Sequence, residues 1–151
     1  MSPSIKKLSV VLIPSESRLW YNDWVEKNAK GTVLDVGKST WEYDFPTIDT
    51  NEKLKPTYHQ DICSSNLASD FFDYVLCNGM YEFVEIPQKM VEEVYRILKP
   101  GGKAIFGFVG KGYKPYKRNW IFYEEGDIDW GKFKILEKKD FNNYHFIICQ
   151  K

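Results

Sequence analysis

Five small or polar residues of this chain have the chemistry of a ligand site, and each stands at or just past the end of a short apolar run: Gly37, Asp49, Asp61, Asn78 and Gly79. A glycine lets the backbone approach a ligand without a Cβ clash, and the neighbouring N–H groups can then meet a carboxylate or a ribose. A carboxylate can accept both hydroxyls of a ribose or the amino group of a base. These residue types in this order indicate a site for a nucleoside-sized ligand.

Short strands are expected to position these residues. The run Thr32 to Gly37 is apolar and ends in glycine, which is typical of a buried strand that feeds a tight turn. Further strands are expected at 47–49, 58–61, 72–77 and 103–109. Ligands of mainly parallel sheets bind beyond the carboxyl ends of the strands, so these ends are expected to converge on one site.

Two helices accompany the strands. The first is predicted over 16–27, with Ser15 as its N-cap. The second is predicted to begin at Pro87, because apolar residues recur after it at spacings of three and four. Pro100–Gly102 is expected to stop this helix before the strand 103–109 begins.

The chain is predicted to end in a hairpin of strands 133–137 and 144–149, joined by a turn at Asn142-Asn143. No internal repeat or low-complexity linker divides the sequence, which predicts a single domain over 1–151. The order of helices and strands predicts the α/β class, with a mainly parallel sheet and an antiparallel C-terminal hairpin.

The connections between the first strands are short. About ten residues separate the first two strands and about seven the next two, whereas a parallel crossover normally takes about a dozen or more and includes a helix. A minimal version of the fold, with some helices missing, is therefore expected. A sheet face without helices exposes apolar surface, and 17% of the residues are aromatic. We expect a second copy in a homodimer, a partner subunit, or the segment Ile5 to Ile13 to cover that face.

Composition argues against several classes of protein. Lys plus Arg equals Asp plus Glu at 21 each, so no net field draws the chain to nucleic acid or to an anionic membrane. The longest purely apolar run, 10–13, is far too short for a membrane span, and the pattern of a secretory leader is missing, so a cytoplasmic protein is expected. Three widely spaced cysteines do not suggest a metal site and are expected to be buried thiols.

The motifs at these positions resemble the class I S-adenosylmethionine-dependent methyltransferases, especially their small "domain 11" type. VLDVG at 33–37 is similar to the first cofactor motif, TID at 47–49 to the acidic end of the second strand, and DIC at 61–63 to the adenine-contacting turn. FDYVLCNGMYEFV at 72–84 resembles the fourth strand with its loop. EEVYRILKPGGKAIFGF at 92–108 resembles the helix, Pro-Gly-Gly and strand that recur together in the family.

This resemblance covers roughly residues 18–151 and implies a Rossmann-like fold with S-adenosylmethionine as cofactor. The cofactor-binding residues it implies are Asp35, Gly37, Lys38, Asp49 (ribose), Asp61 and Ile62 (adenine), and Asn78 and Gly79 (methionine part). In the family the segment after strand 103–109 lies over the cofactor mouth, so Tyr113, Tyr116 and Arg118 are candidates on the acceptor side. This stretch mixes cations with aromatics, as single-stranded nucleic-acid sites do, but we expect its aromatics to pack back on the sheet.

Two motifs depart from the family pattern. The first loop usually reads G-x-G, whereas Gly37 is followed here by Lys38, Ser39 and Thr40. A Cβ at Ser39 could crowd the cofactor, or Lys38 could pair with the cofactor's carboxylate. The usual Glu-His-Val after the fourth strand is Glu-Phe-Val at 82–84, which removes an imidazole as a base, and no catalytic residue is assigned.

Three functions fit these features, in this order. The first is S-adenosylmethionine-dependent methyl transfer to a small-molecule or glycan-type acceptor, mainly by placing the nucleophile and the methyl carbon in line within a dry pocket. The alternative is a catalytically degenerate subunit that binds, scaffolds or regulates a partner. Nicotinamide-dependent oxidoreduction could also use Asp49, but it ranks third because G-x-G-x-x-G is missing.

Overall fold

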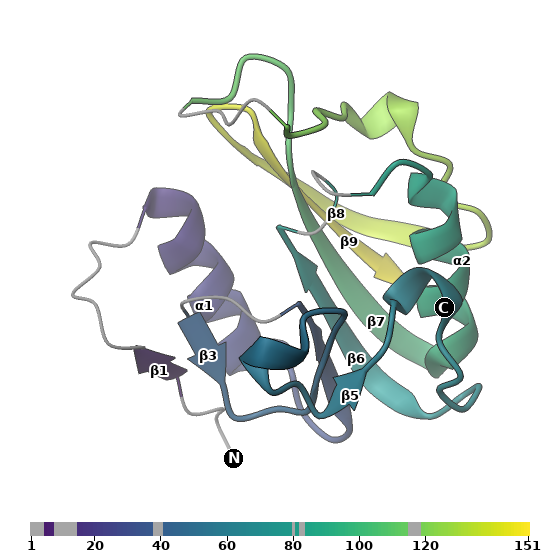
Figure 1. Cartoon of the computed structure of the whole chain (residues 1–151). Helices are drawn as coiled ribbons and strands as arrows, with labels where there is room; N and C mark the ends of the chain where they lie inside the picture. Colours follow the sequence, from purple (N-terminus) through teal and green to yellow (C-terminus); the bar gives the residue numbers. More distant parts are fainter. Residues whose placement is uncertain (1–4, 8–14, 38–40, 80, 82–83, 115–118) are drawn as a thin grey trace.

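The computed structural model describes residues 5–7, 15–37, 41–79, 81, 84–114 and 119–151. Within this part, a seven-stranded sheet lies between two α-helices, and a two-stranded sheet lies beside it (Figure 1). The strands are β1 (Ile5–Lys7), β2 (Val33–Val36), β3 (Trp41–Tyr43), β4 (Thr47–Asp49), β5 (Tyr58–His59), β6 (Phe72–Asn78), β7 (Leu98–Val109), β8 (Lys134–Phe141) and β9 (Tyr144–Gln150). The helices are α1 (Glu16–Asn28) and α2 (Pro87–Ile97), with the 3-10 turns η1 (Glu52–Leu54), η2 (Ile62–Ser64) and η4 (Glu125–Asp127).

The large sheet has the strand order β5-β4-β2-β6-β7-β9-β8. The strands from β5 to β7 in this order run parallel, and β9 pairs antiparallel with both β7 and β8. Asn142 and Asn143 both have positive φ in the tight turn between β8 and β9. The predicted class is confirmed: a mainly parallel α/β sheet that ends in an antiparallel hairpin.

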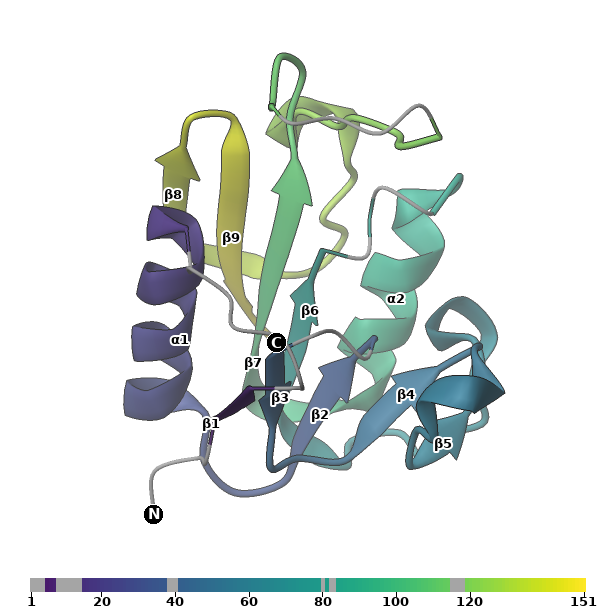
Figure 2. The ribbon, with the colours of Figure 1, turned by 60° about the vertical axis from the view of Figure 1, so that its left-hand side comes forward.

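Helix α1 covers one face of the sheet. Ser15 caps it as predicted, because its side chain accepts a hydrogen bond from the Arg18 amide at 3.2 Å. Tyr21 and Val25 are buried against apolar residues of the sheet, and the Tyr21 ring stacks on Phe146 with 5.7 Å between ring centroids. Figure 2 shows α1 and α2 on opposite sides of the sheet.

Helix α2 covers the other face. Pro87 begins it, at a position where no intrahelical N–H is needed, and its apolar stripe is buried against the sheet. We predicted that Pro100–Gly102 would stop this helix, but the helix ends at Ile97 and those residues lie inside β7. Gly102 lies so close to β6 that a Cβ there would be 3.1 Å from the carbonyl oxygen of Asp73. Pairing with β6 therefore starts the strand earlier than the local sequence suggests.

The two connections that were predicted to be too short for helices contain no α-helix in their described parts, only the 3-10 turn η1 between β4 and β5. β2 reaches β4 through a segment that includes β3, which pairs with β1 in the small sheet. Between β4 and β5, the amides of Thr47 and Thr57 each donate to the hydroxyl of the other residue, at 3.0 and 3.1 Å. Between β5 and β6, the turn η2 leads into an extended segment. The minimal version of the fold is confirmed.

Aromatic side chains pack on both faces of the sheet. On the α2 side, Tyr81 is fully buried and its ring contacts that of Trp130. On the α1 side, the Tyr43 ring packs edge-on against that of Tyr21. Of the segment 5–13, expected on a bare face, residues 5–7 form β1 beside β3, and residues 8–13 lie outside the described part. The homodimer stays a prediction.

The three thiols differ in burial. Cys77 and Cys149 are buried free cysteines, as predicted, and burial raises the pKa of Cys149 to about 12. Cys63 is only half-buried, which the sequence did not predict. In the described ranges, no helix is long and apolar enough to cross a membrane.

Gly107 of β7 provides a test of this packing. A Cβ at Gly107 would be 2.3 Å from Asn78 Oδ1 and 2.8 Å from a ring carbon of Phe146. We expect Gly107→Ala to lower the free energy of unfolding by about 1–3 kcal/mol in urea denaturation, because both neighbours must shift. The matched control is Gly126→Ala, since a Cβ there meets no atom within 4 Å; its effect should stay within about 0.5 kcal/mol. Equal stability of the two variants would contradict the packing described.

Candidate functional site

The carboxyl ends of β2, β4 and β6 meet at one edge of the sheet. The Gly37 amide donates to the Ile48 carbonyl at 2.8 Å, which places Gly37 beside Asp49. β2 also pairs with β6 in a register that, continued to its end, brings Gly37 level with Asn78. Adjacent strands lie about 4.8 Å apart, so Asp49 and Asn78 stand on either side of the glycine turn. The structure thus brings these predicted residues together.

The glycines at the ends of β2 and β6 have a backbone conformation that disfavours other residues. Gly37 and Gly79 both have φ of 77°, in the left-handed region. The Gly79 amide donates to the Gly107 carbonyl at 2.9 Å, which keeps the turn after β6 close to β7. Asp35 is 8% exposed beneath the first turn, and Lys38 lies outside the described residues.

The acid that ends β4 and the acid that follows β5 each cap their own turn. Asp49 Oδ1 accepts from the Asn51 amide and Asp61 Oδ1 from the Cys63 amide, both at 2.8 Å. A carboxylate has about four acceptor positions, so one such bond fixes its direction and is compatible with a ligand donating to it. Since the Cys63 amide is used in this way, Ile62 is the better candidate for an amide that meets a base.

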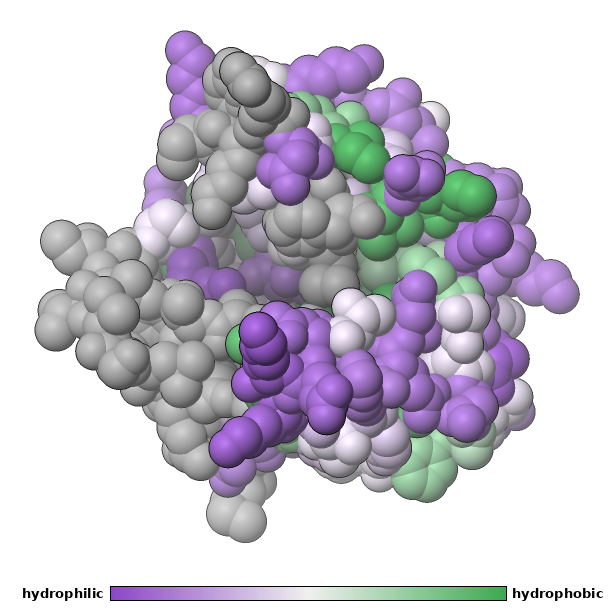
Figure 3. Space-filling model, in the orientation of Figure 1, coloured by the Kyte–Doolittle hydropathy of each residue, from purple (hydrophilic) through white to green (hydrophobic). Residues whose placement is uncertain are grey.

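A pocket of about 420 Å³ lies between η2 and the residues that lead into α2. Its lining is Thr50, Asp61, Ile62, Cys63, Ser64, Val84, Glu85, Ile86 and Lys89. The volume lies within the range of about 300–1,000 Å³ that is usual for small-molecule sites. Figure 3 shows the molecule hollowed in the region of the strand ends, with a hydrophilic lower rim and a hydrophobic area to the upper right.

Aromatic residues flank the other side of Asn78. The Tyr144 hydroxyl donates to Asn78 Oδ1, across the position where Gly107 has no side chain. The Tyr113 ring packs against that of Tyr144 at 5.5 Å and against Trp120 at 6.4 Å between centroids. Tyr113 thus lies near the predicted acceptor side, and its contacts agree with aromatics that pack back on the sheet. Tyr116 and Arg118, like Phe83, lie outside the described residues.

A polar cluster from α1 and β3 lies beside Asp35, and sequence reasoning missed it. Burial, and next the Asp35 carboxylate, raises the pKa of Tyr21. The Arg18 guanidinium lies 5.3 Å from the Tyr21 ring centroid, and the hydroxyl of Tyr43, whose ring packs on that of Tyr21, donates to Asn22 Oδ1. The Tyr21 hydroxyl is buried without a hydrogen-bond partner in the described part, which is costly unless a ligand or water completes it. The spacing of Arg18 and Tyr21, one helical turn apart, was the available signal.

The family model described as "Methyltransferase domain" matches residues 29–106, about half of the chain. The chain belongs to this methyltransferase family. S-adenosylmethionine is the cofactor of the family, and the prediction from the sequence motifs is confirmed at this level.

Two curated relatives share part of this methyltransferase domain. An 80-residue stretch is 39% identical to an uncharacterized protein of Methanocaldococcus jannaschii, and 86 residues are 33% identical to the ubiquinone biosynthesis O-methyltransferase of Coxiella burnetii. The matches cover 48% and 56% of this chain, but only 39% and 33% of those proteins. The methyltransferase domain described here therefore spans about two fifths or less of these relatives.

Solved structures share the fold of this methyltransferase domain. A SAM-dependent methyltransferase from Aquifex aeolicus has a TM-score of 0.59 at 16% identity, covering 78% of this chain and 80% of that one. The Burkholderia thailandensis 1,6-didemethyltoxoflavin-N1-methyltransferase, with S-adenosylhomocysteine bound, has a TM-score of 0.57 at 11% identity, covering 79% of this chain and 70% of that one. The [4+2]-cyclase SpnF has a TM-score of 0.60 at 13% identity, covering 79% of this chain and 73% of that one. The Rossmann-like fold is confirmed, and at these identities the likeness concerns the fold alone.

The described residues fit the parts of S-adenosylmethionine. The 420 Å³ pocket has an acid at Asp61 and a buried apolar side chain at Ile62, which suit a purine base. The Tyr21 hydroxyl, which has no hydrogen-bond partner among the described residues, lies with a carboxylate and a guanidinium near the glycine turn. This charge pattern matches an amino-acid group. Asp49 stands between these two regions, where a ribose would link them.

Cys63 reports on the pocket. Burial, and next the Asp61 carboxylate, raises the pKa of Cys63 to about 11. At pH 8 we expect iodoacetamide to label Cys63 about 100-fold more slowly than an ordinary cysteine, because the thiolate is scarce. S-adenosylhomocysteine should slow the labelling further, since Cys63 lines the pocket. Mass spectrometry of the alkylated peptide measures both rates, and Cys63→Ser is the control, because the other two thiols are buried. Labelling at an ordinary rate that ligand does not change would contradict this geometry.

Proposed function

We propose that this chain transfers the methyl group of S-adenosylmethionine to a small-molecule or glycan-type acceptor. The observation that carries the proposal is the gathering of Gly37, Asp49 and Asn78 at one sheet edge, next to the pocket at Asp61 and Ile62. Membership of the methyltransferase family supports it.

Each group of residues has a binding task in this proposal. The Asp49 carboxylate accepts hydrogen bonds from the ribose hydroxyls, and the Asp61 carboxylate accepts one from the adenine amino group. The adenine ring lies against the Ile62 side chain. Asn78 and Gly79 lie under the methionine part. The ammonium and carboxylate groups of the methionine part face the cluster of Asp35, Arg18 and Tyr21. Lys38 is a further predicted partner of this carboxylate.

The chemistry needs positioning more than proton transfer. When bound, S-adenosylmethionine supplies an electrophilic methyl carbon on a sulfonium. The chain's own residues hold the acceptor nucleophile in line with that carbon and exclude water. Tyr113 and Tyr144 form an aromatic wall beside Asn78, suited to the acceptor side. Such a site needs no strong base where the acceptor is already nucleophilic.

The alternative is a catalytically degenerate subunit that binds, scaffolds or regulates a partner. The single glycine of the first loop favours it. The histidines also favour it: His59 Nε2 lies 2.8 Å from the Thr50 carbonyl, and the His145 nitrogens face Glu124 and Asp140 at 3.0 and 2.9 Å. Both imidazoles are thus engaged with the protein itself.

Calorimetric titration tests the cofactor site. We expect S-adenosylmethionine and S-adenosylhomocysteine to bind with micromolar dissociation constants, and Asp49→Ala to abolish the heat because the ribose loses its acceptor. Asp23→Ala is the matched control, since Asp23 is exposed on α1 and pairs with Lys27 at 2.9 Å. No heat from the wild-type chain at millimolar ligand would refute methyl transfer and favour the degenerate subunit.

Turnover separates the two leading functions. We expect S-adenosylhomocysteine to form when the chain is incubated with S-adenosylmethionine and a panel of phenols, amines and sugars, because the aromatic wall beside Asn78 suits such acceptors. Product is measured by mass spectrometry, with the Asp49→Ala variant as control. Tight binding without product from any acceptor class would favour the degenerate subunit.

A homodimer and a cytoplasmic location complete the proposal. The argument for a second copy was the apolar surface left by missing helices. Aromatic residues of the chain pack on both faces of the sheet, so the oligomeric state must be measured directly. Light scattering that gives the mass of one chain at high concentration would contradict the homodimer.

A further inference from the structure

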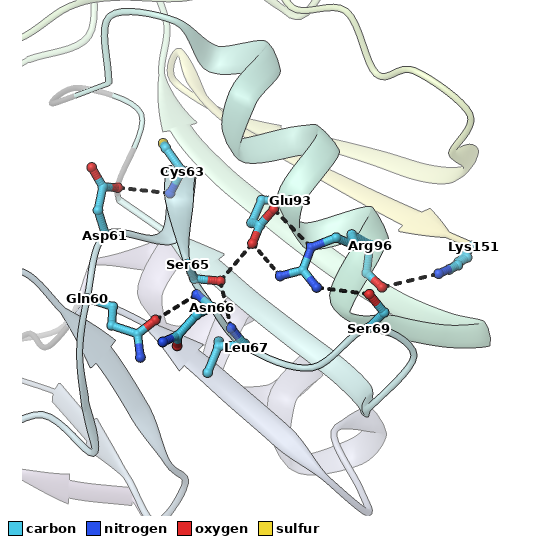
Figure 4. A network of polar contacts seen from close by, with 10 residues as sticks. All are labelled: Gln60, Asp61, Cys63, Ser65, Asn66, Leu67, Ser69, Glu93, Arg96 and Lys151. Carbon is cyan, nitrogen blue, oxygen red and sulfur yellow. Dashed lines mark hydrogen bonds and ion pairs between the residues drawn. The ribbon is translucent and has the colours of Figure 1, made fainter.

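A side-chain network ties the segment 60–70 to helix α2 (Figure 4). The Ser65 hydroxyl donates to Glu93 Oε1 at 2.7 Å. Arg96, one turn further along the helix, donates to both oxygens of the same carboxylate, from Nη2 at 2.5 Å and from Nε at 3.1 Å. The Glu93 carboxylate therefore receives donors from the helix and from the segment at once.

Arg96 also links α2 to the C-terminal end of the segment 60–70. Arg96 Nη1 donates to the Ser69 hydroxyl at 2.9 Å. Lys151 Nζ, from the C-terminal end of the chain, donates to Asp70 at 2.7 Å and to the Leu98 carbonyl at 2.8 Å. The segment is thus fixed to α2 at Ser65, directly after η2, and at its C-terminal end at Ser69 and Asp70.

Glu93 is a charged and mostly buried side chain. Its side chain is only 15% exposed, and the hydrogen bond from Arg96, against the effect of burial, lowers its pKa. Hydrogen bonds to a charged and partly buried carboxylate are stronger than neutral ones. The tie therefore holds firmly at neutral pH.

This tie sets the spacing of the pocket. One wall of the pocket is the turn 61–64, and the other is 84–86 with Lys89 of α2. Ile62 and Leu67 are buried in the same apolar cluster as Met90, so the turn rests on the helix. No helix of its own supports the turn in the described connection from β5 to β6. The position of Asp61 relative to the second wall depends on the contact with α2.

We propose that Glu93 is a positioning residue that holds the turn 61–64 at the distance needed to recognise the amino group of a 6-aminopurine. This inference rests on the proposed function, because it names what sets the base selectivity of the same pocket. Glu93 acts through Ser65 and Arg96 and does not touch the ligand. Its loss lets the turn move away from α2, which misplaces Asp61 and the Ile62 amide.

The experiment compares S-adenosylhomocysteine with S-inosylhomocysteine, whose base has an oxo group in place of the amino group. We expect Glu93→Ala to weaken the first ligand roughly tenfold and to leave the second unchanged, so that the selectivity falls by the same factor. Glu93→Gln keeps an acceptor oxygen and should retain most of the selectivity. Glu92→Ala is the matched control, since Glu92 is the neighbouring exposed acid on α2 and bonds Gln88.

Amide hydrogen exchange gives a readout without ligand. In Glu93→Ala the amides of 62–67 should exchange about tenfold faster, while those of α1 and β9 keep the rates of the wild-type chain. Unchanged exchange in 62–67 would overturn the proposal whatever the ligands do. Faster exchange with unchanged selectivity would also overturn it, since the network would then only stabilise the fold. A wild-type chain that binds neither ligand would refute the proposed function, and this inference with it.

Discussion

The short parallel crossovers constrain the rest of this structure. Parallel strands normally need about a dozen residues and a helix to return to the same edge of a sheet. Here β2, β4 and β5 are joined by segments 37–46 and 50–57. The main chain of such segments must still find hydrogen-bond partners, and side chains supply several of them, as in the reciprocal bonds of Thr47 and Thr57.

The acids at the strand ends acquire two tasks from this constraint. Asp49 and Asp61 each cap a turn, which is the structural task expected of isolated acids at such positions. The same bonds fix the direction of each carboxylate before any ligand arrives, and groups ordered in advance lose less entropy on binding. Capping and ligand binding are therefore compatible here. The hydrogen bond between Ser65 and Glu93 orders the turn after β5 in advance in the same way.

The sequence by itself determined the elements whose signals are local. An apolar run ended by glycine predicted β2 and its turn, and three- and four-residue apolar spacing predicted α2. Asn142-Asn143 predicted the hairpin turn, because both residues tolerate positive φ. The order of strand ends also predicted which residues share the sheet edge, since carboxyl ends of parallel strands lie together.

Only the tertiary structure decided contacts between distant segments. The start of β7 follows from pairing with β6, against the local glycine signal at Pro100–Gly102. The bond from Tyr144 to Asn78 joins residues 66 positions apart, and Tyr21 comes close enough to Asp35 to feel its charge only because α1 packs on that face. Such contacts depend on register and on which face a helix covers, and local patterns of residue type carry no information about either.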